Sequence, residues 1–259
     1  MHRLRSPKVC ASLVMIAWLA SLIALWGMTS AGSAAIKDGS CNSKDLQNKG
    51  LQLEMADSPA KALPVLNGDS KKAGCIRAGV AAQVEADYLF IPAYSALSLA
   101  LFLFVRAIRL ASRGEEGTVL LILAVLLVLA MVGGDVTENR QLTPIIELAG
   151  KAQPPENLIG ERLPLLRAAS YVKMGALALA AAILGALWTS ASGSRLVWLP
   201  RLLGLATAAL FLSGMIGESW QLAAAGMAAF AAFGIAGLIH AIAVAVGRGE
   251  TSDLQVKKV

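Results

Sequence analysis

Six long apolar runs alternate with polar segments along the chain. A helix that spans a bilayer needs about 20 mostly apolar residues, and the six runs approach or exceed that length. They cover residues 9–28, 88–105, 118–134, 168–188, 202–216 and 222–246. The pattern predicts an all-α fold, a polytopic bundle of six transmembrane helices. The fifth and sixth helices should form an antiparallel pair joined by a tight turn over 217–220.

The first apolar run has a second interpretation. A basic start, an apolar stretch and the small residues over 30–35 resemble a secretory signal peptide, with Gly32 and Ala34 suited to cleavage. Against this, the run is longer than the roughly 7–15 apolar residues of a typical cleaved signal. Both interpretations stay open, and cleavage would leave five helices without changing the remaining topology.

The alternation divides the chain into four parts. We expect a signal anchor or signal peptide (1–34), an extracytoplasmic loop (35–83), a transmembrane bundle (84–247) and a cytoplasmic tail (248–259). Composition agrees, since 56% of residues are hydrophobic and 15% are charged, against about 25% charged in an ordinary soluble domain. These figures exclude a soluble globule, a disordered chain, collagen and a coiled coil.

Basic residues indicate the orientation. The chain has 23 Lys and Arg against 17 Asp and Glu, and many of the basic residues flank apolar runs at the ends that alternation places on one side. Because cationic loops stay in the cytoplasm, both ends of the chain are predicted to be cytoplasmic, in a bacterial inner membrane. The lipid bilayer is thus the expected partner of these charges, and nucleic acid is not.

The loop over 35–83 contains Cys41 and Cys75, the two cysteines outside the first apolar region. On the extracytoplasmic side such a pair is expected to form a disulfide. Closing a loop of about 34 residues would stabilise the fold by roughly 3–4 kcal/mol. No histidine lies near the pair, so a zinc site is a poorer interpretation.

A second extracytoplasmic loop is expected over 140–166. Thr143 followed by Pro144 is typical of a helix start, with a hydroxyl N-cap before proline at the first helical position. The residues 145–149 are therefore predicted to form a short helix on the bilayer surface. The double proline Pro154–Pro155 would end it.

Polar residues near the ends of the apolar runs are the candidates for function, because ionisable groups inside a membrane are costly. Asp87 and Tyr94 share one face of the second predicted helix. Asp135, Glu138 and Asn139 share one face at the end of the third. A plain helix N-cap is the alternative role for Asp87, and a solvated membrane edge is the alternative for the acidic pair.

Two carboxylates on one helix face repel each other, so a cationic partner is expected. Lys173 lies several residues inside the fourth run and could pair with Asp135 or Glu138. The topology gathers these polar groups at the extracytoplasmic edge as a ligand or ion-pair cluster. Its predicted members are Asp87, Tyr94, Asp135, Glu138, Asn139, Lys173 and Glu218.

The pattern Asp87-x-x-Phe90-x-x-x-Tyr94, then Gly134-Asp135-x-x-Glu138-Asn139, then Lys173 in the next apolar run resembles a loose group of uncharacterised bacterial multi-pass membrane proteins. The resemblance extends from Asp87 to the sixth helix and omits the cysteine loop. It implies that these polar residues form a shared site. It implies no reaction, since the group has no assigned activity.

Three functions are compatible with the sequence. Common catalytic, phosphate-binding and metal-ligand motifs are missing, so we assign no catalytic residue, metal site or cofactor. The first hypothesis is a non-enzymatic accessory or assembly component that binds other membrane-protein subunits. The second is a small transporter or ligand-binding protein that uses the acidic cluster. The third is a membrane-embedded enzyme that uses a carboxylate as acid or base.

Overall fold

The computed structural model describes residues 6–36, 41–114, 117–188 and 198–246. This part of the chain is helical and contains no strand. The predicted tail 248–259 lies outside the described residues. Six helices are long and apolar enough to cross a membrane, as predicted: α1 (Pro7–Ala34), α5 (Ala73–Arg113), α6 (Thr118–Ala149), α7 (Glu156–Leu187), α8 (Trp198–Ile216) and α9 (Trp220–Ala245).

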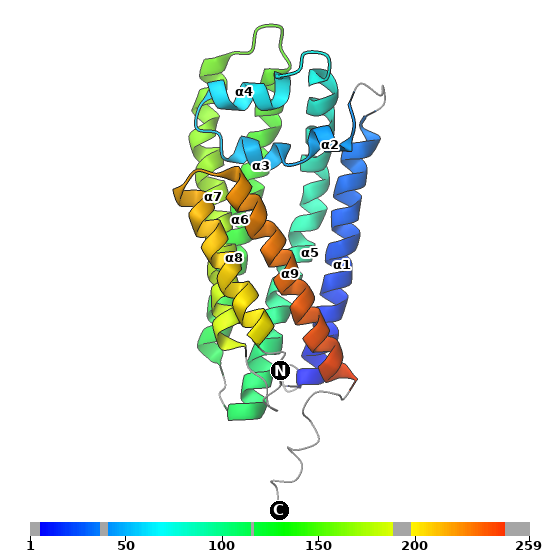
Figure 1. The fold of residues 1–259 in the computed structure, drawn as a ribbon, viewed down its shortest axis with the longest axis vertical. Helices are drawn as coiled ribbons and strands as arrows, with labels where there is room; N and C mark the ends of the chain where they lie inside the picture. The colour runs from blue at the N-terminus through cyan, green and yellow to red at the C-terminus, as the bar shows by residue number, and fades with distance from the viewer. Residues whose placement is uncertain (1–5, 37–40, 115–116, 189–197, 247–259) are drawn as a thin grey trace, which may run out of the picture.

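The six long helices run along one long axis, and successive ones point in opposite directions (Figure 1). The first residues of α1 and the last residues of α9 lie at the same end. Three short helices, α2 (Ser43–Leu46), α3 (Lys49–Glu54) and α4 (Pro59–Asn67), lie across the opposite end. We call residues 41–72 the lid and that end of the bundle the lid end.

Among the six long helices, α5, α6 and α7 extend furthest beyond the predicted apolar runs. At 1.5 Å per residue, the 41 residues of α5 extend about 60 Å, twice the hydrocarbon thickness of about 30 Å. α5 begins at Ala73, inside the predicted loop 35–83. Asp87 therefore lies well inside a helix, and its alternative role as a helix N-cap is wrong.

The predicted surface helix after Pro144 is also wrong. α6 continues through Pro144 to Ala149, and α7 begins at Glu156, so the second loop shrinks to residues 150–155. The Thr143 hydroxyl donates to the Asn139 carbonyl, 3.1 Å away, inside the continuous helix. Burial of Ile145 and Ile146 against the lid outweighs the backbone hydrogen bond that proline removes.

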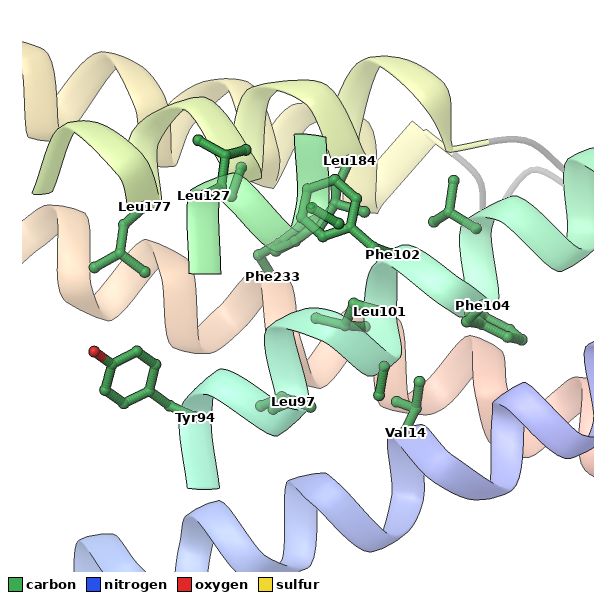
Figure 2. Packing of buried hydrophobic residues seen from close by; sticks show 14 of the residues in the cluster. Val14, Tyr94, Leu97, Leu101, Phe102, Phe104, Leu127, Leu177, Leu184 and Phe233 are labelled. Carbon is green, nitrogen blue, oxygen red and sulfur yellow. The ribbon is translucent and has the colours of Figure 1, made fainter. Parts of the chain in front are cut away.

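Apolar side chains pack into two separate cores. The first lies between the membrane-spanning parts of all six long helices and includes Leu101, Phe104, Met131 and Phe233. Figure 2 shows Tyr94 at the edge of the labelled side chains of this core, with its hydroxyl directed away from Leu97 and Leu101.

The second core lies at the lid end. Leu53 and Leu66 of the lid pack there with Ile145 of α6 and Leu163 of α7. The extended ends of α5, α6 and α7 thus supply the apolar surface that buries the lid. The lid has too few apolar residues to form a core alone.

The predicted disulfide is confirmed. Cys41 at the start of the lid is bonded to Cys75 in the first turn of α5, with their Cα atoms 6.1 Å apart. Beside it, the backbone N–H of Asn42 donates to Asp45 at 2.9 Å, and the Lys72 ammonium lies 3.1 Å from the same carboxylate. Both donors favour the ionised form and hold the pKa of Asp45 below its ordinary value. The α2 cap is therefore formed at neutral pH and weakens as the pH falls through that pKa.

The disulfide should stabilise the lid against local opening. We expect Cys41→Ser, Cys75→Ser and the double variant to lower the free energy of lid opening by the same amount. For a 34-residue separation this amount is about 3–4 kcal/mol. Hydrogen exchange of lid amides measures this opening. Wild-type protein treated with a reductant should match the three variants. Equal protection in oxidised wild type and in the variants would contradict the prediction.

Candidate functional site

A layer of polar side chains separates the two cores. On α5, Val84 belongs to the lid-end core and Ile91 to the membrane core, and Asp87 lies between them. On α6, Leu142 belongs to the lid-end core and Met131 to the membrane core. Asp135, Glu138 and Asn139 lie between these two residues. On α7, Ser170 and Lys173 lie between a residue of the lid-end core and a residue of the membrane core. Three neighbouring helices therefore place polar residues at one level.

Lys173 is the centre of this layer. Its ammonium nitrogen lies 2.7 Å from Glu138 Oε1, 3.0 Å from Asp135 Oδ1 and 3.3 Å from Glu54 Oε2. An ammonium has three N–H donors, so the three carboxylates can satisfy all of them. Asp135, Glu138 and Glu54 are buried, which makes these ion pairs far less screened than pairs at a surface.

Neutral side chains complete the hydrogen bonding. The Tyr94 hydroxyl donates to Asp135 Oδ2, and the Ser170 hydroxyl donates to Glu138 Oε2 at 2.9 Å. The Asn139 amide donates to Asp87 Oδ2 at 2.7 Å. We call these residues the Lys173 cluster: Glu54, Asp87, Tyr94, Asp135, Glu138, Asn139, Ser170 and Lys173.

The structure thus brings together six of the seven site residues that the sequence suggested. The exception is Glu218, in the turn between α8 and α9, which pairs with Arg167 of α7. Tyr171 joins the same group by donating to the Met215 carbonyl at 3.3 Å. Arg167 precedes Lys173 by six residues, so Lys173 lies about 9 Å deeper along α7 than the α8–α9 turn. The cluster is therefore not a solvated helix end.

Two members of the cluster were not predicted. Ser170 lies one turn before Lys173 on α7, and helical spacing could have identified it. Glu54 is the last residue of α3 in the lid, and nothing in the loop sequence distinguishes it from other acidic residues. Only the packing of the lid against α7 places its carboxylate beside Lys173.

A glycine allows α6 and α7 to approach at this level. A Cβ on Gly134 would lie 2.8 Å from the Ala169 carbonyl oxygen and 3.0 Å from the Lys173 backbone nitrogen. Such distances are below normal van der Waals contact. Gly134 therefore sets the helix separation at which Lys173 reaches Asp135 and Glu138.

The cluster forms one wall of a cavity of about 640 Å³ at the lid end. Side chains from α1, the lid, α5, α6, α7 and α9 line it. Its volume is within the 300–1,000 Å³ or so that is usual for small-molecule sites. The walls combine the charged cluster with apolar and aromatic groups, among them Phe90, Leu177 and Phe230.

Carboxyl groups outnumber cationic groups within the cluster. The cluster has four carboxyl groups, of Glu54, Asp87, Asp135 and Glu138, and one ammonium group, of Lys173. Asp87 accepts from Asn139 and, among the described residues, forms no ion pair within 4.0 Å. In the described part of the chain no three His, Cys, Asp or Glu side chains are grouped so that they could hold a metal ion.

The chain matches no protein-family model, no curated protein and no solved structure. The class that the structure itself defines is a six-helix integral membrane protein with a disulfide-tied lid. Any specific activity must therefore be argued from the site.

Gly134→Ala should separate α6 from α7 and loosen the cluster. We expect a loss of about 1–3 kcal/mol in unfolding free energy, as for other overpacked contacts. Gly133→Ala is the matched control, because its Cβ would meet no other atom within 4 Å and alanine favours a helix. Thermal unfolding in a mild neutral detergent measures both. Equal unfolding temperatures for the two variants would contradict the role of Gly134.

Proposed function

We propose that this protein is a ligand-binding membrane protein whose lid-end cavity takes an organic ammonium group. The single observation that carries the proposal is the position of Asp87, which lines the cavity and has an amide rather than a cation as its partner. A carboxylate at this depth is more stable with a positive charge beside it. An ammonium group on the ligand would supply that charge.

The neighbouring rings support an organic cation. Phe90 and Tyr94 both line the cavity, and their ring centroids are 5.3 Å apart. Aromatic faces attract ammonium groups, particularly where water is scarce. The apolar part of the wall would bind the hydrocarbon part of the same ligand.

The same proposal includes an orientation. A disulfide persists in oxidising compartments, so the Cys41–Cys75 bond supports a lid outside the cytoplasm and both ends of the chain inside it, as in a bacterial inner membrane. We also propose that α1 is retained rather than cleaved. Its residues Cys10, Ala11 and Val14 are wholly buried in the membrane core, and Met28 helps to line the cavity.

Association with other membrane-protein subunits stays a prediction. The long helices expose many large apolar side chains, such as Trp26, Leu89 and Ile216. Lipid covers such surfaces as well as a protein partner does. The cavity is the feature that favours ligand binding over an accessory role.

Octylammonium and octanoate form a probe pair with equal chain length and opposite charge. We expect octylammonium to raise the unfolding temperature of the purified protein in neutral detergent, and octanoate to leave it unchanged. Asp87→Asn should weaken octylammonium binding about tenfold or more, because a hydrogen bond to a charged group contributes about 1.5–3 kcal/mol.

Glu85→Gln is the matched control for Asp87→Asn. Glu85 is two residues away on α5, is exposed and lies outside the cavity lining. The Glu85→Gln variant should bind octylammonium with the affinity of the wild type. Unchanged octylammonium binding in Asp87→Asn, or equal stabilisation by octanoate, would overturn the proposed function.

A further inference from the structure

The cavity reaches the surface of the bundle between α1 and α9. Thr29 and Ser33 of α1 and Met227 of α9 line it and are exposed. In Figure 1 these two helices are close at the end opposite the lid and diverge toward the lid end. The opening therefore lies on the side of the bundle, rather than only beneath the lid.

The α9 side of this opening lies on an apolar helix, whereas Thr29 and Ser33 on its α1 side follow the apolar run 9–28. Met227 and Phe230 follow the first residue of α9, Trp220, by seven and ten residues, which places them about 10 and 15 Å below the lid end of that helix. Since α9 is apolar enough to cross a membrane, a gap beside Met227 and Phe230 would open toward the bilayer.

Two lysines lie on the lid side of the same cavity. Lys44 and Lys49 line it, whereas the carboxylates of Asp87, Asp135 and Glu138 lie deeper, between the two cores. The lid side of the lining thus has two lysines besides Glu54, and the deeper side has three carboxyl groups besides Lys173. This order of charges matches a ligand with an ammonium group and an adjacent phosphate.

We propose that the occupant is a zwitterionic phospholipid from the lid-side leaflet, which enters laterally between α1 and α9. The proposal rests on the proposed function and names its ligand class. The headgroup ammonium lies against Asp87 and the phosphate faces Lys49 and Lys44. From the phosphate the acyl chains turn back through the gap between α1 and α9, past Met227, into the bilayer.

Native mass spectrometry of the full chain in neutral detergent tests this. The protein is titrated with phosphatidylethanolamine, which carries an ammonium and a phosphate, and with phosphatidylglycerol, which carries only the phosphate. We expect at least fivefold tighter binding of phosphatidylethanolamine. Equal or tighter binding of phosphatidylglycerol would overturn the inference.

The lateral route has its own matched pair of variants. Met227 and Ile235 are both on α9 and are 43% and 46% exposed, but only Met227 lines the cavity. Met227→Trp should weaken phosphatidylethanolamine binding at least fivefold, and Ile235→Trp should not. Equal affinities for the lipid in these two variants would overturn the lateral route.

Lys49→Gln separates the two proposals. It should weaken phosphatidylethanolamine binding severalfold without weakening octylammonium binding, because octylammonium has no phosphate for Lys49 to contact. Lys71→Gln, an exposed lid lysine outside the cavity lining, should change neither. If octylammonium binds and phosphatidylethanolamine does not, the inference fails and the proposed function stands. If neither binds, both fail.

Discussion

Moving a charged group from water into an apolar interior is opposed by several kcal/mol per ion, unless opposite charges and hydrogen bonds compensate it. Lys173 of α7 meets this condition with three carboxylates from two other segments: α6 supplies Asp135 and Glu138, and the lid supplies Glu54. Because each partner is needed to compensate the others, the ion pairs fix the positions of α6, α7 and the lid together. The close contact at Gly134 and the neutral donors Tyr94 and Ser170 serve the same arrangement.

This layer also explains why the bundle has two cores. Apolar packing continues above and below the Lys173 cluster, and the lid residue Met55 packs with the membrane core. Packing in the lid-end core and the Cys41–Cys75 bond hold the lid in place. Packing in the membrane core holds the six long helices together. The cavity at the junction has charged groups on one side and apolar groups on the other. These walls complement the charged and apolar parts of the amphiphilic ligand that we propose.

The number of spans, their approximate positions and the disulfide could be predicted from hydropathy and cysteine placement. The helix ends could not. α5, α6 and α7 extend past their apolar runs because the lid covers their polar ends, and a hydropathy pattern contains no information about a partner segment. Thr143 and Pro144 resembled a helix start because the sequence does not show that the lid packs on the residues after them. In the structure, Ile145 and Ile146 continue the buried face of α6.

The site residues on the long helices followed from helical spacing and alternation, which bring Asp87, Asp135 and Lys173 to one level. Glu54 and the different partner of Glu218 did not follow, because each depends on a loop or turn packing against α7. A double-mutant cycle between Lys173→Met and Glu54→Gln therefore measures most directly whether one ammonium joins the lid to the bundle. The predicted result is a coupling of about 1–3 kcal/mol in unfolding free energy. A coupling within about 0.3 kcal/mol of zero would contradict it.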